Sequence, residues 1–251
     1  MGQLKDRTAL IIGSATGIGR AVALSFAAEG ANVIIADRKQ AIERAALVKD
    51  IKKTGKRAID CHCDVMIEED VQAALATALK FGGGRLDILV NNAGIGLPMT
   101  NFADMNWADW QRVMDINLRG VAYGMHNALP IMLKQGYGRI INTASQLAHK
   151  PAAQASAYSA SKAAIVALST AVAQEVASKG VTVNCVCPGP TDTASWRSSD
   201  PIWAAKKVAD LPISRVASPE EIAPAYVFLA SSDASFMIGQ SVSPNGGDVS
   251  W

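Results

Sequence analysis

Hydrophobic residues fall into short, nearly continuous runs that alternate with longer segments whose apolar positions recur every three or four residues. The short runs are rich in β-branched residues and predict strands. The predicted strands are Thr8–Ile12, Val33–Ala36, Arg57–Cys61, Ile88–Asn91, Arg139–Thr143, Thr182–Val186 and Ser241–Ser243. Because these runs do not alternate between apolar and polar residues, both faces of their sheet are expected to be buried.

The segments between the strands predict helices, starting with Gly17–Glu29 and Ala41–Thr54. Two of the predicted helices are long. One carries regularly spaced apolar residues from Met114 to Met132, and the other spans about Ala157–Ser178 and is rich in Ala and Ser. Alternating strands and helices predict an α/β fold: a single Rossmann-like, doubly wound parallel sheet of about seven strands with helices on both faces. With no linker or repeat, residues 1–251 are expected to form one domain.

Composition narrows the possible partners. Apolar residues make up 49% of the 251 residues, charged residues 18%, and the formal net charge is +2. Without a clustered basic face, neither nucleic acid nor an anionic membrane is an expected partner. No apolar run approaches the roughly 20 residues of a membrane span. The first residues run almost directly into a strand, with no secretory signal, so a cytoplasmic location is expected.

The four cysteines form two pairs, Cys61 with Cys63 and Cys185 with Cys187. Both pairs lie in predicted strands, where residues two apart point to the same face. A zinc site would favour C-x-x-C spacing on loops. The pattern therefore favours buried, reduced thiols over a metal site or disulfides.

A glycine-rich loop follows the first strand, reading Gly13-Ser14-Ala15-Thr16-Gly17-Ile18-Gly19 and opening into a helix. Residues without a Cβ permit positive φ and let a diphosphate approach the backbone. The helix N-terminus adds unpaired N–H groups and the positive end of its dipole. The loop therefore favours dinucleotide binding, although an ordinary strand–helix turn can carry the same glycines.

Asp37 ends the second strand, 18 residues after Gly19. A carboxylate at this place accepts hydrogen bonds from the adenosine ribose hydroxyls and repels a 2′-phosphate. The preferred cofactor is therefore NAD(H). Two alternatives remain: Arg38 offers a cation that suits NADP, and Asp37 also fits a helix N-cap.

Tyr158 and Lys162 are four residues apart and so share one helical face. A free phenol has a pKa near 10, too high for a base at neutral pH. A lysine cation nearby favours the phenolate and lowers that pKa. Because Y-x-x-x-K is common by chance, its weight depends on the motifs around it.

Those motifs resemble the short-chain dehydrogenase/reductase family. Asn91-Asn92-Ala93-Gly94 follows the fourth strand, Ser145 precedes Tyr158 by thirteen residues, and Pro188-Gly189 follows the sixth strand. The likeness runs from the first strand to Asn245-Gly246-Gly247. Ile12 replaces the family's usual Thr and Asn245 its common Asp, and neither position bears on the chemistry.

The resemblance implies an enzyme with four catalytic residues. Tyr158 would be the acid/base, and Ser145 would hold the same substrate oxygen. Lys162 would lower the pKa of Tyr158 and bind the nicotinamide ribose. Asn117 would hold a water of the proton relay.

The resemblance also extends the expected cofactor site. Asp64 would contact the adenine amino group, and Thr193 would lie near the diphosphate and carboxamide. The expected NAD(H) contacts are Gly13, Thr16, Gly17, Ile18, Gly19, Asp37, Asp64, Val65, Asn91, Ala93, Gly94, Tyr158, Lys162, Pro188, Gly189, Thr191 and Thr193.

Specificity in the family resides after the catalytic serine and in a substrate loop, here at about residues 190–212. The candidate substrate residues are Gln146, Lys150, Trp196 and Arg197. A tryptophan cover favours a small secondary alcohol or ketone, of polyol, sugar-derived or hydroxy-acid type. Lys150 and Arg197 would suit an anionic substrate, but solvated loop charges are the favoured interpretation of both.

Two other functions stay open. One is an NADPH-dependent 3-ketoacyl-thioester reductase, which Asp37 disfavours. The other is a non-catalytic NAD-binding sensor, which the complete set of catalytic residues disfavours. The two long helices resemble those through which family members form tetramers, so a homotetramer is expected.

Overall fold

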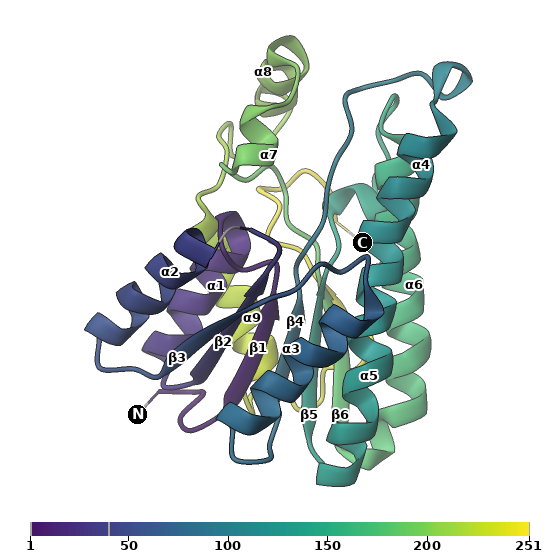
Figure 1. Ribbon diagram of the computed structural model, residues 1–251. Helices are drawn as coiled ribbons and strands as arrows, with labels where there is room; N and C mark the ends of the chain where they lie inside the picture. Colours follow the sequence, from purple (N-terminus) through teal and green to yellow (C-terminus); the bar gives the residue numbers. More distant parts are fainter. Residues whose placement is uncertain (1, 40, 251) are drawn as a thin grey trace.

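The computed structural model describes residues 2–39 and 41–250, which fold around one parallel sheet with helices on both faces (Figure 1). The sheet has seven strands in the order β3-β2-β1-β4-β5-β6-β7. Their bounds are β1 Thr8–Ile12, β2 Asn32–Asp37, β3 Ala58–His62, β4 Ile88–Asn91, β5 Gly138–Thr143, β6 Val181–Val186 and β7 Ser241–Val242. The predicted fold class is confirmed, and no strand end differs from its predicted position by more than one residue.

Helices connect successive strands. They are α1 Gly17–Ala28, α2 Ala41–Lys53, α3 Glu68–Phe81, α4 Trp107–Met114, α5 Gly120–Gln135, α6 Ser156–Val176, α7 Ala194–Arg197, α8 Pro201–Ala209 and α9 Pro219–Ala230. The first two end one residue before their predicted ends. In the described part of the chain, no helix combines the length and apolar character needed to cross a membrane.

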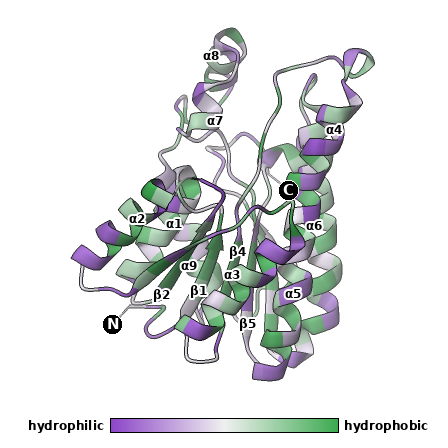
Figure 2. Cartoon of the chain, in the orientation of Figure 1, coloured by the Kyte–Doolittle hydropathy of each residue, from purple (hydrophilic) through white to green (hydrophobic). Residues whose placement is uncertain are grey.

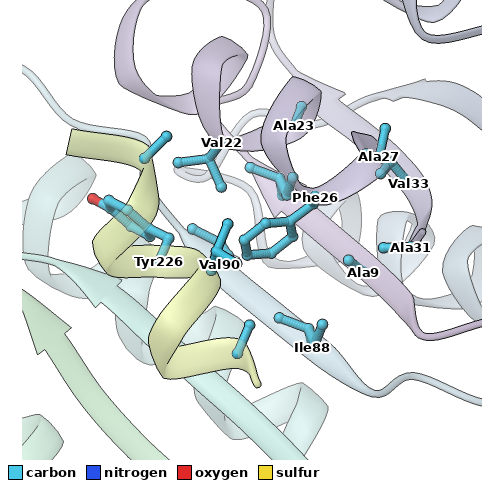
Figure 3. Close-up of a cluster of buried hydrophobic side chains, with 14 of the residues drawn as sticks. Ala9, Val22, Ala23, Phe26, Ala27, Ala31, Val33, Ile88, Val90 and Tyr226 are labelled. Carbon is cyan, nitrogen blue, oxygen red and sulfur yellow. The ribbon is translucent and has the colours of Figure 1, made fainter. Parts of the chain in front are cut away.

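Both faces of the sheet are buried, as the continuous apolar runs predict. In β1, Ala9 and Ile11 pack with α1 and α9, whereas Leu10 and Ile12 pack into the core on the opposite face. Figure 3 shows the first of these cores, in which Phe26 of α1 is packed together with residues of the neighbouring strands. The strands appear green in the hydropathy colouring of Figure 2, while the helices carry purple segments away from the sheet.

The long helix expected around Met114–Met132 is present and contains one wider turn near its start. Between α4 and α5, Asp115–Arg119 forms a π-helical turn in which the N–H of Gly120 donates to the carbonyl of Asp115. The apolar periodicity continues across this turn, so the pattern alone predicts one uninterrupted helix. Single π turns of this kind are frequent at functional sites, and this one contains Asn117.

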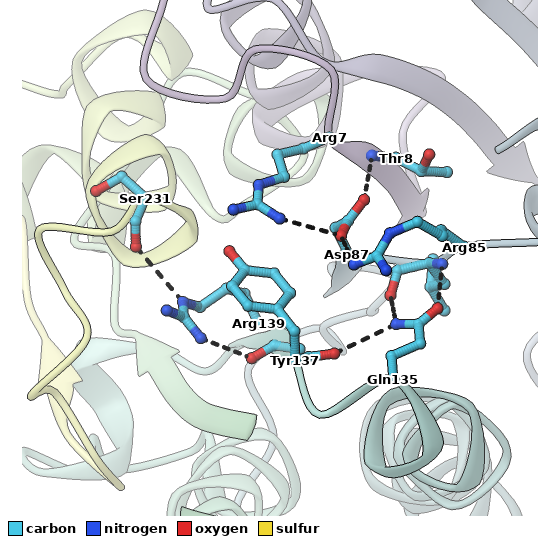
Figure 4. Close-up of polar contacts among 10 residues, drawn as sticks. Arg7, Thr8, Arg85, Asp87, Gln135, Tyr137, Arg139 and Ser231 are labelled. Atoms are coloured by element: carbon cyan, nitrogen blue, oxygen red, sulfur yellow. Dashed lines mark hydrogen bonds and ion pairs between the residues drawn. The ribbon is translucent and has the colours of Figure 1, made fainter. Parts of the chain in front are cut away.

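The amino edge of the sheet carries a polar network (Figure 4). Asp87, directly before β4, accepts hydrogen bonds from the backbone N–H of Thr8 (2.9 Å), Arg85 Nη2 (2.9 Å) and Arg7 Nη1 (3.3 Å). The guanidinium groups of Arg7 and Arg139 lie 4.2 and 4.5 Å from the centre of the Tyr137 ring. These contacts join the starts of β1, β4 and β5.

At the carboxyl edge, the strand order changes direction between β1 and β4. In doubly wound sheets this switch point leaves a crevice that binds ligands. The glycine-rich loop follows β1, and the Asn91-Asn92-Ala93-Gly94 segment begins at the end of β4. Above this edge, α4 rises on one side and α7 with α8 on the other (Figure 1).

Candidate active site

A cavity of about 1110 Å³ opens at this carboxyl edge. Its walls come from the loops after β1, β2, β3, β4, β5 and β6, together with α6 and the α7–α8 segment. The predicted site residues that line it are Gly13, Thr16, Gly17, Ile18, Asp37, Asp64, Val65, Ala93, Gly94, Ser145, Gln146, Tyr158, Lys162, Pro188, Gly189, Thr191, Thr193 and Trp196. Five other predicted residues, Gly19, Asn91, Asn117, Lys150 and Arg197, are absent from the lining.

The glycine-rich loop has the geometry of a diphosphate cradle. Gly13 has φ +83°, and a Cβ there would lie 2.4 Å from the backbone nitrogen of Ala93. Gly19 packs under the loop, where a Cβ would lie 2.1 Å from the carbonyl oxygen of Gly13. The Thr16 side chain does not cap α1, so the first N–H groups of this helix remain available to an anion. The loop therefore fits the diphosphate of a dinucleotide.

Asp37 is buried at the end of β2 and lines the cavity. One carboxylate oxygen accepts from the backbone N–H of Ala15 (2.9 Å), and the other from that of Lys39 (2.9 Å). Each oxygen retains a lone pair that could accept a ribose hydroxyl. Arg38 next to it is exposed at the same wall and has no ion pair with any described residue. Both groups that distinguish NAD from NADP thus border this end of the cavity.

Of the two neighbouring asparagines after β4, Asn92 faces the site. Its amide donates to the carbonyl of Gly13 (2.7 Å), and its oxygen accepts from the Thr143 hydroxyl (3.1 Å). Asn91 lies behind the lining and donates to Asn142 Oδ1 (2.8 Å). Sequence reasoning assigned Asn91 and missed Asn92. The strand could have shown that only one of the two faces the site, because consecutive residues of a strand point to opposite faces.

Ser145, Tyr158 and Lys162 come together at the other end of the cavity. Ser145 follows β5, whereas Tyr158 and Lys162 share one face of α6. Lys162 Nζ donates to the carbonyl of Thr143 (2.7 Å) and lies 5.7 Å from the centre of the Tyr158 ring. A hydroxyl, a phenol and an amine therefore converge on one volume.

Burial dominates the ionisation of this group. It raises the pKa of Tyr158, opposed by the contact with the Ser145 hydroxyl. It also lowers the pKa of Lys162 to about 8. The sequence predicts that Lys162 lowers the pKa of Tyr158. In the protein without cofactor, burial instead raises the pKa of Tyr158, and the contact with Ser145 is the influence that lowers it. Charged forms of both groups are disfavoured in the same low-dielectric pocket.

Asn117 lies beneath the lining, in the π turn between α4 and α5. Its side-chain oxygen accepts from the N–H of Ile95 (2.8 Å), and its amide donates to the carbonyl of Ile95 (3.0 Å) and to Ser161 Oγ (3.1 Å). It thereby joins the segment after Gly94 to α6, next to Lys162.

The predicted substrate residues separate into two groups. Gln146 and Trp196 line the cavity. Lys150 instead binds Asp248 through the carboxylate (3.1 Å) and the backbone carbonyl (2.9 Å). Arg197 is exposed and forms a two-bond pair with Asp192 at 2.7 and 2.9 Å. Because an acidic partner holds each of these cations outside the cavity, the expectation that they line the substrate site is corrected.

The cavity lining also includes Arg112 of α4, which was not predicted from the sequence, and Trp203 of α8, which was expected with Trp196 as a cover for a small substrate. The two tryptophan rings have centroids 5.7 Å apart. No motif marks Arg112, because its place in the cavity depends on how α4 packs over α6.

Cys63 lines the cavity, and Cys185 and Cys187 lie near the catalytic group. All four are free thiols, with Cys61 partly exposed and the others buried. Burial raises the pKa of Cys61 to about 11 and that of Cys63 to about 12. Among residues 2–39 and 41–250, no cluster of three His, Cys, Asp or Glu side chains has the arrangement of a metal site.

Fold and site together define an oxidoreductase that uses a nicotinamide cofactor. Comparison with known proteins agrees: the family described as enoyl-(acyl carrier protein) reductase matches residues 13–248. The cis-4-hydroxycyclohexanecarboxylate dehydrogenase of Sinomonas cyclohexanicum is 38% identical over 243 residues, 96% of each chain. The chain belongs to the short-chain dehydrogenase/reductase family.

Two further proteins similar to this chain are named for different reactions. The 3-oxoacyl-[acyl-carrier-protein] reductase of Synechocystis sp. is 37% identical over 253 residues, 99% of each chain. The crystal structure of a proposed gluconate dehydrogenase from Agrobacterium tumefaciens matches with a TM-score of 0.93 and 33% identity, covering 99% of this chain and 98% of that one.

Proposed function

We propose that this protein is an NAD(H)-dependent dehydrogenase that interconverts a small secondary alcohol and its ketone. The observation that carries the proposal is the single cavity itself. Asp37 and the glycine-rich loop border one end of it, and Ser145, Tyr158 and Lys162 border the other. A dinucleotide spanning the cavity would place its two ends at these two groups.

When bound, the cofactor supplies the hydride acceptor for oxidation and the donor for reduction. The protein handles the proton. In oxidation, the Tyr158 phenolate takes the proton of the substrate hydroxyl, and the Ser145 hydroxyl donates to the same oxygen and holds it in place. The Lys162 ammonium, 5.7 Å from the Tyr158 ring, favours the phenolate. In reduction, the neutral phenol returns the proton to the carbonyl oxygen.

The substrate is proposed to be of polyol, sugar-derived or hydroxy-acid type. The two tryptophans of α7 and α8 cover the cavity and favour a small molecule. Two of the compared proteins bear names that fit this class, a hydroxycyclohexanecarboxylate dehydrogenase and a proposed gluconate dehydrogenase.

Preference for NAD over NADP rests on Asp37, because a buried carboxylate repels a 2′-phosphate. One observation favours a second candidate. Arg38 is exposed at the same wall without an ion pair among the described residues, which suits NADPH and a 3-ketoacyl-thioester reductase like the Synechocystis relative. A non-catalytic NAD sensor is the least supported alternative, because the catalytic group is complete.

The same proposal includes a cytoplasmic homotetramer. The surfaces expected to meet are those of the two long helical regions, α4–α5 and α6. Light scattering of the purified protein tests this directly: a mass of four chains supports it, and a monomer overturns it.

A panel of polyols, sugar acids and cyclic alcohols, each offered with NAD and with NADP, tests the activity. Cofactor reduction followed by absorbance is expected with NAD and at least one secondary alcohol. Tyr158→Phe should abolish turnover and leave NADH binding measurable. Near-normal turnover by this variant would contradict the mechanism, and NADH binding without turnover of any alcohol would favour the sensor.

A further inference from the structure

Arg112 lies at the wall of the cavity that the catalytic residues share. It belongs to α4, one helical turn before Ile116, and both residues line the cavity. Ile116 belongs to the π turn that follows α4, so the C-terminal end of α4 borders the site. The opposite wall is the α7–α8 segment, which rises across from α4 (Figure 1).

The Arg112 guanidinium is exposed and has no ion pair or side-chain hydrogen bond with any residue in 2–39 or 41–250. The carboxylate nearest in sequence on the C-terminal side, Asp115, is already engaged by Arg119 (3.1 Å) and by the amide of Gln111 (2.7 Å). Arg112 therefore presents an uncommitted positive charge to the cavity.

The other cations of the lining are placed elsewhere. Arg38 and Lys39 border the Asp37 end, and Lys162 is buried beside Tyr158. On the α7–α8 wall, the carboxylate of Asp200 accepts from the N–H of Trp203 (2.8 Å) and caps α8. Arg112 is thus the uncommitted cation of the substrate end, within the part of the chain that the structure describes.

The cavity that Arg112 and the catalytic residues share also has apolar lining. Met99, Met105, Ile116 and Leu147 line it together with the two tryptophans, beside the polar Gln146 and Gln154. Such a surface suits a hydrocarbon body. A ligand that satisfies both ends has an anionic group at one end and a hydroxyl at the other.

We infer that the substrate is a hydroxy acid whose carboxylate binds Arg112 while its hydroxyl reaches Ser145 and Tyr158. The inference rests on the proposed dehydrogenase function and narrows its substrate class. A guanidinium offers paired N–H donors that match the two oxygens of a carboxylate. Arg112 is then a specificity-determining residue that lies outside the catalytic group.

A pair of matched substrates tests the inference. We compare kcat/KM for cis-4-hydroxycyclohexanecarboxylate and for the uncharged 4-methylcyclohexanol, with NAD, in the wild type and in Arg112→Met. The variant is expected to lose about 10- to 100-fold with the carboxylate, as for a lost hydrogen-bonded charge pair, and to keep its rate with the neutral alcohol within about twofold. Arg112→Lys should recover part of the loss.

Lys134→Met is the matched control, because Lys134 is an exposed cation of α5 that does not line the cavity and has no ion pair with a described residue. It should leave both substrates unaffected. Equal losses for the two substrates in Arg112→Met, or no loss at all, would overturn the inference. A wild type that prefers the neutral alcohol would also overturn the inference. That result would leave the proposed dehydrogenase function intact.

Binding separates this inference from the proposed function. Calorimetry of cyclohexanecarboxylate with the NADH-saturated protein should show binding by the wild type and about tenfold or greater weakening in Arg112→Met. This result would support the carboxylate site even if no alcohol were oxidised, in which case only the proposed function would fail. Absence of binding by the wild type would overturn the carboxylate site.

Discussion

At the scale of single residues, burial is the main influence on the pKa values of Tyr158 and Lys162. Lys162 is buried, and Tyr158 is half-buried at the cavity wall. Burial opposes the charged form of each: it raises the pKa of the phenol and lowers that of the amine to about 8. Oxidation then depends on the small fraction of Tyr158 that is phenolate, whereas reduction uses the neutral phenol, which is the dominant form.

This gives a pH prediction for the wild type. Oxidation needs the phenolate, which becomes more abundant as pH rises toward the raised pKa of Tyr158, and the Lys162 ammonium, which is lost above its pKa of about 8. The kcat/KM for the alcohol should therefore increase with pH up to about 8, while reduction, which needs the neutral phenol, should not gain rate. Initial rates in both directions across pH check this. An oxidation rate that falls with increasing pH below about 8 would contradict the assignment of Tyr158 as the base.

Single residues also mark the limit of what the sequence predicts. The positions of Ser145, Tyr158 and Lys162 at one cavity follow from spacing and motif order. The position of Lys150 outside the cavity does not follow from the sequence, because its partner Asp248 is 98 residues away. A sequence shows the charge of a side chain and conceals which distant group neutralises it.

At the scale of elements, the segment carrying α7 and α8 is held to the body by Asp248. Lys207 of α8 binds one oxygen of this carboxylate (2.6 Å), and Lys150 from the segment after Ser145 binds the other (3.1 Å). The Asp248 side chain has no exposed surface, and its lysines lower its pKa against the opposing effect of burial. The C-terminal segment thus joins two walls of the substrate end.

Lys207→Met should loosen α8 because it leaves the enclosed Asp248 carboxylate with one lysine partner. We expect the KM for the alcohol to rise roughly three- to tenfold and protease cleavage within residues 194–210 to accelerate, with little change in NADH affinity. Lys206→Met is the control, since Lys206 is exposed on the same helix and makes no ion pair with a described residue. Identical behaviour of the two variants would show that the Asp248 contact does not position α8.

Elements were predicted unevenly from sequence. The ends of the buried strands are accurate to one residue, because a strand covered on both faces is a continuous apolar run between turns. The π turn at Asp115–Arg119 was not predicted, since apolar spacing records which face is buried and is insensitive to one wider turn. Asn117, which lies in this turn, was identified only through family resemblance.

Across the whole molecule, the two edges of the parallel sheet have different tasks. The carboxyl edge carries the cavity with every lining group of the candidate active site. The amino edge carries the network around Asp87, which ties the starts of β1 and β4 to neighbouring arginines. Stability and function are thereby separable by mutation.

Asp87→Ala should lower stability by about 1–3 kcal/mol, because it leaves the buried N–H of Thr8 and two arginines without their acceptor. Denaturant unfolding measures the change, while the KM for the alcohol and the Kd of NADH should remain at wild-type values. Asp233→Ala serves as the control, since this exposed carboxylate makes no ion pair with the described residues. A specific loss of NADH affinity in Asp87→Ala, with stability unchanged, would contradict the division between the edges.

If one cavity takes NAD(H) at the Asp37 end and an alcohol at the Tyr158 end, the protein should discriminate between the two nicotinamide cofactors. Fluorescence titration of the wild type with NADH and with NADPH measures this. NADH is expected to bind at least about tenfold more tightly, because the Asp37 carboxylate accepts ribose hydroxyls and repels a 2′-phosphate. Tighter binding of NADPH would contradict this expectation: Arg38 would then determine the cofactor, and the 3-ketoacyl-thioester reductase would become the leading function.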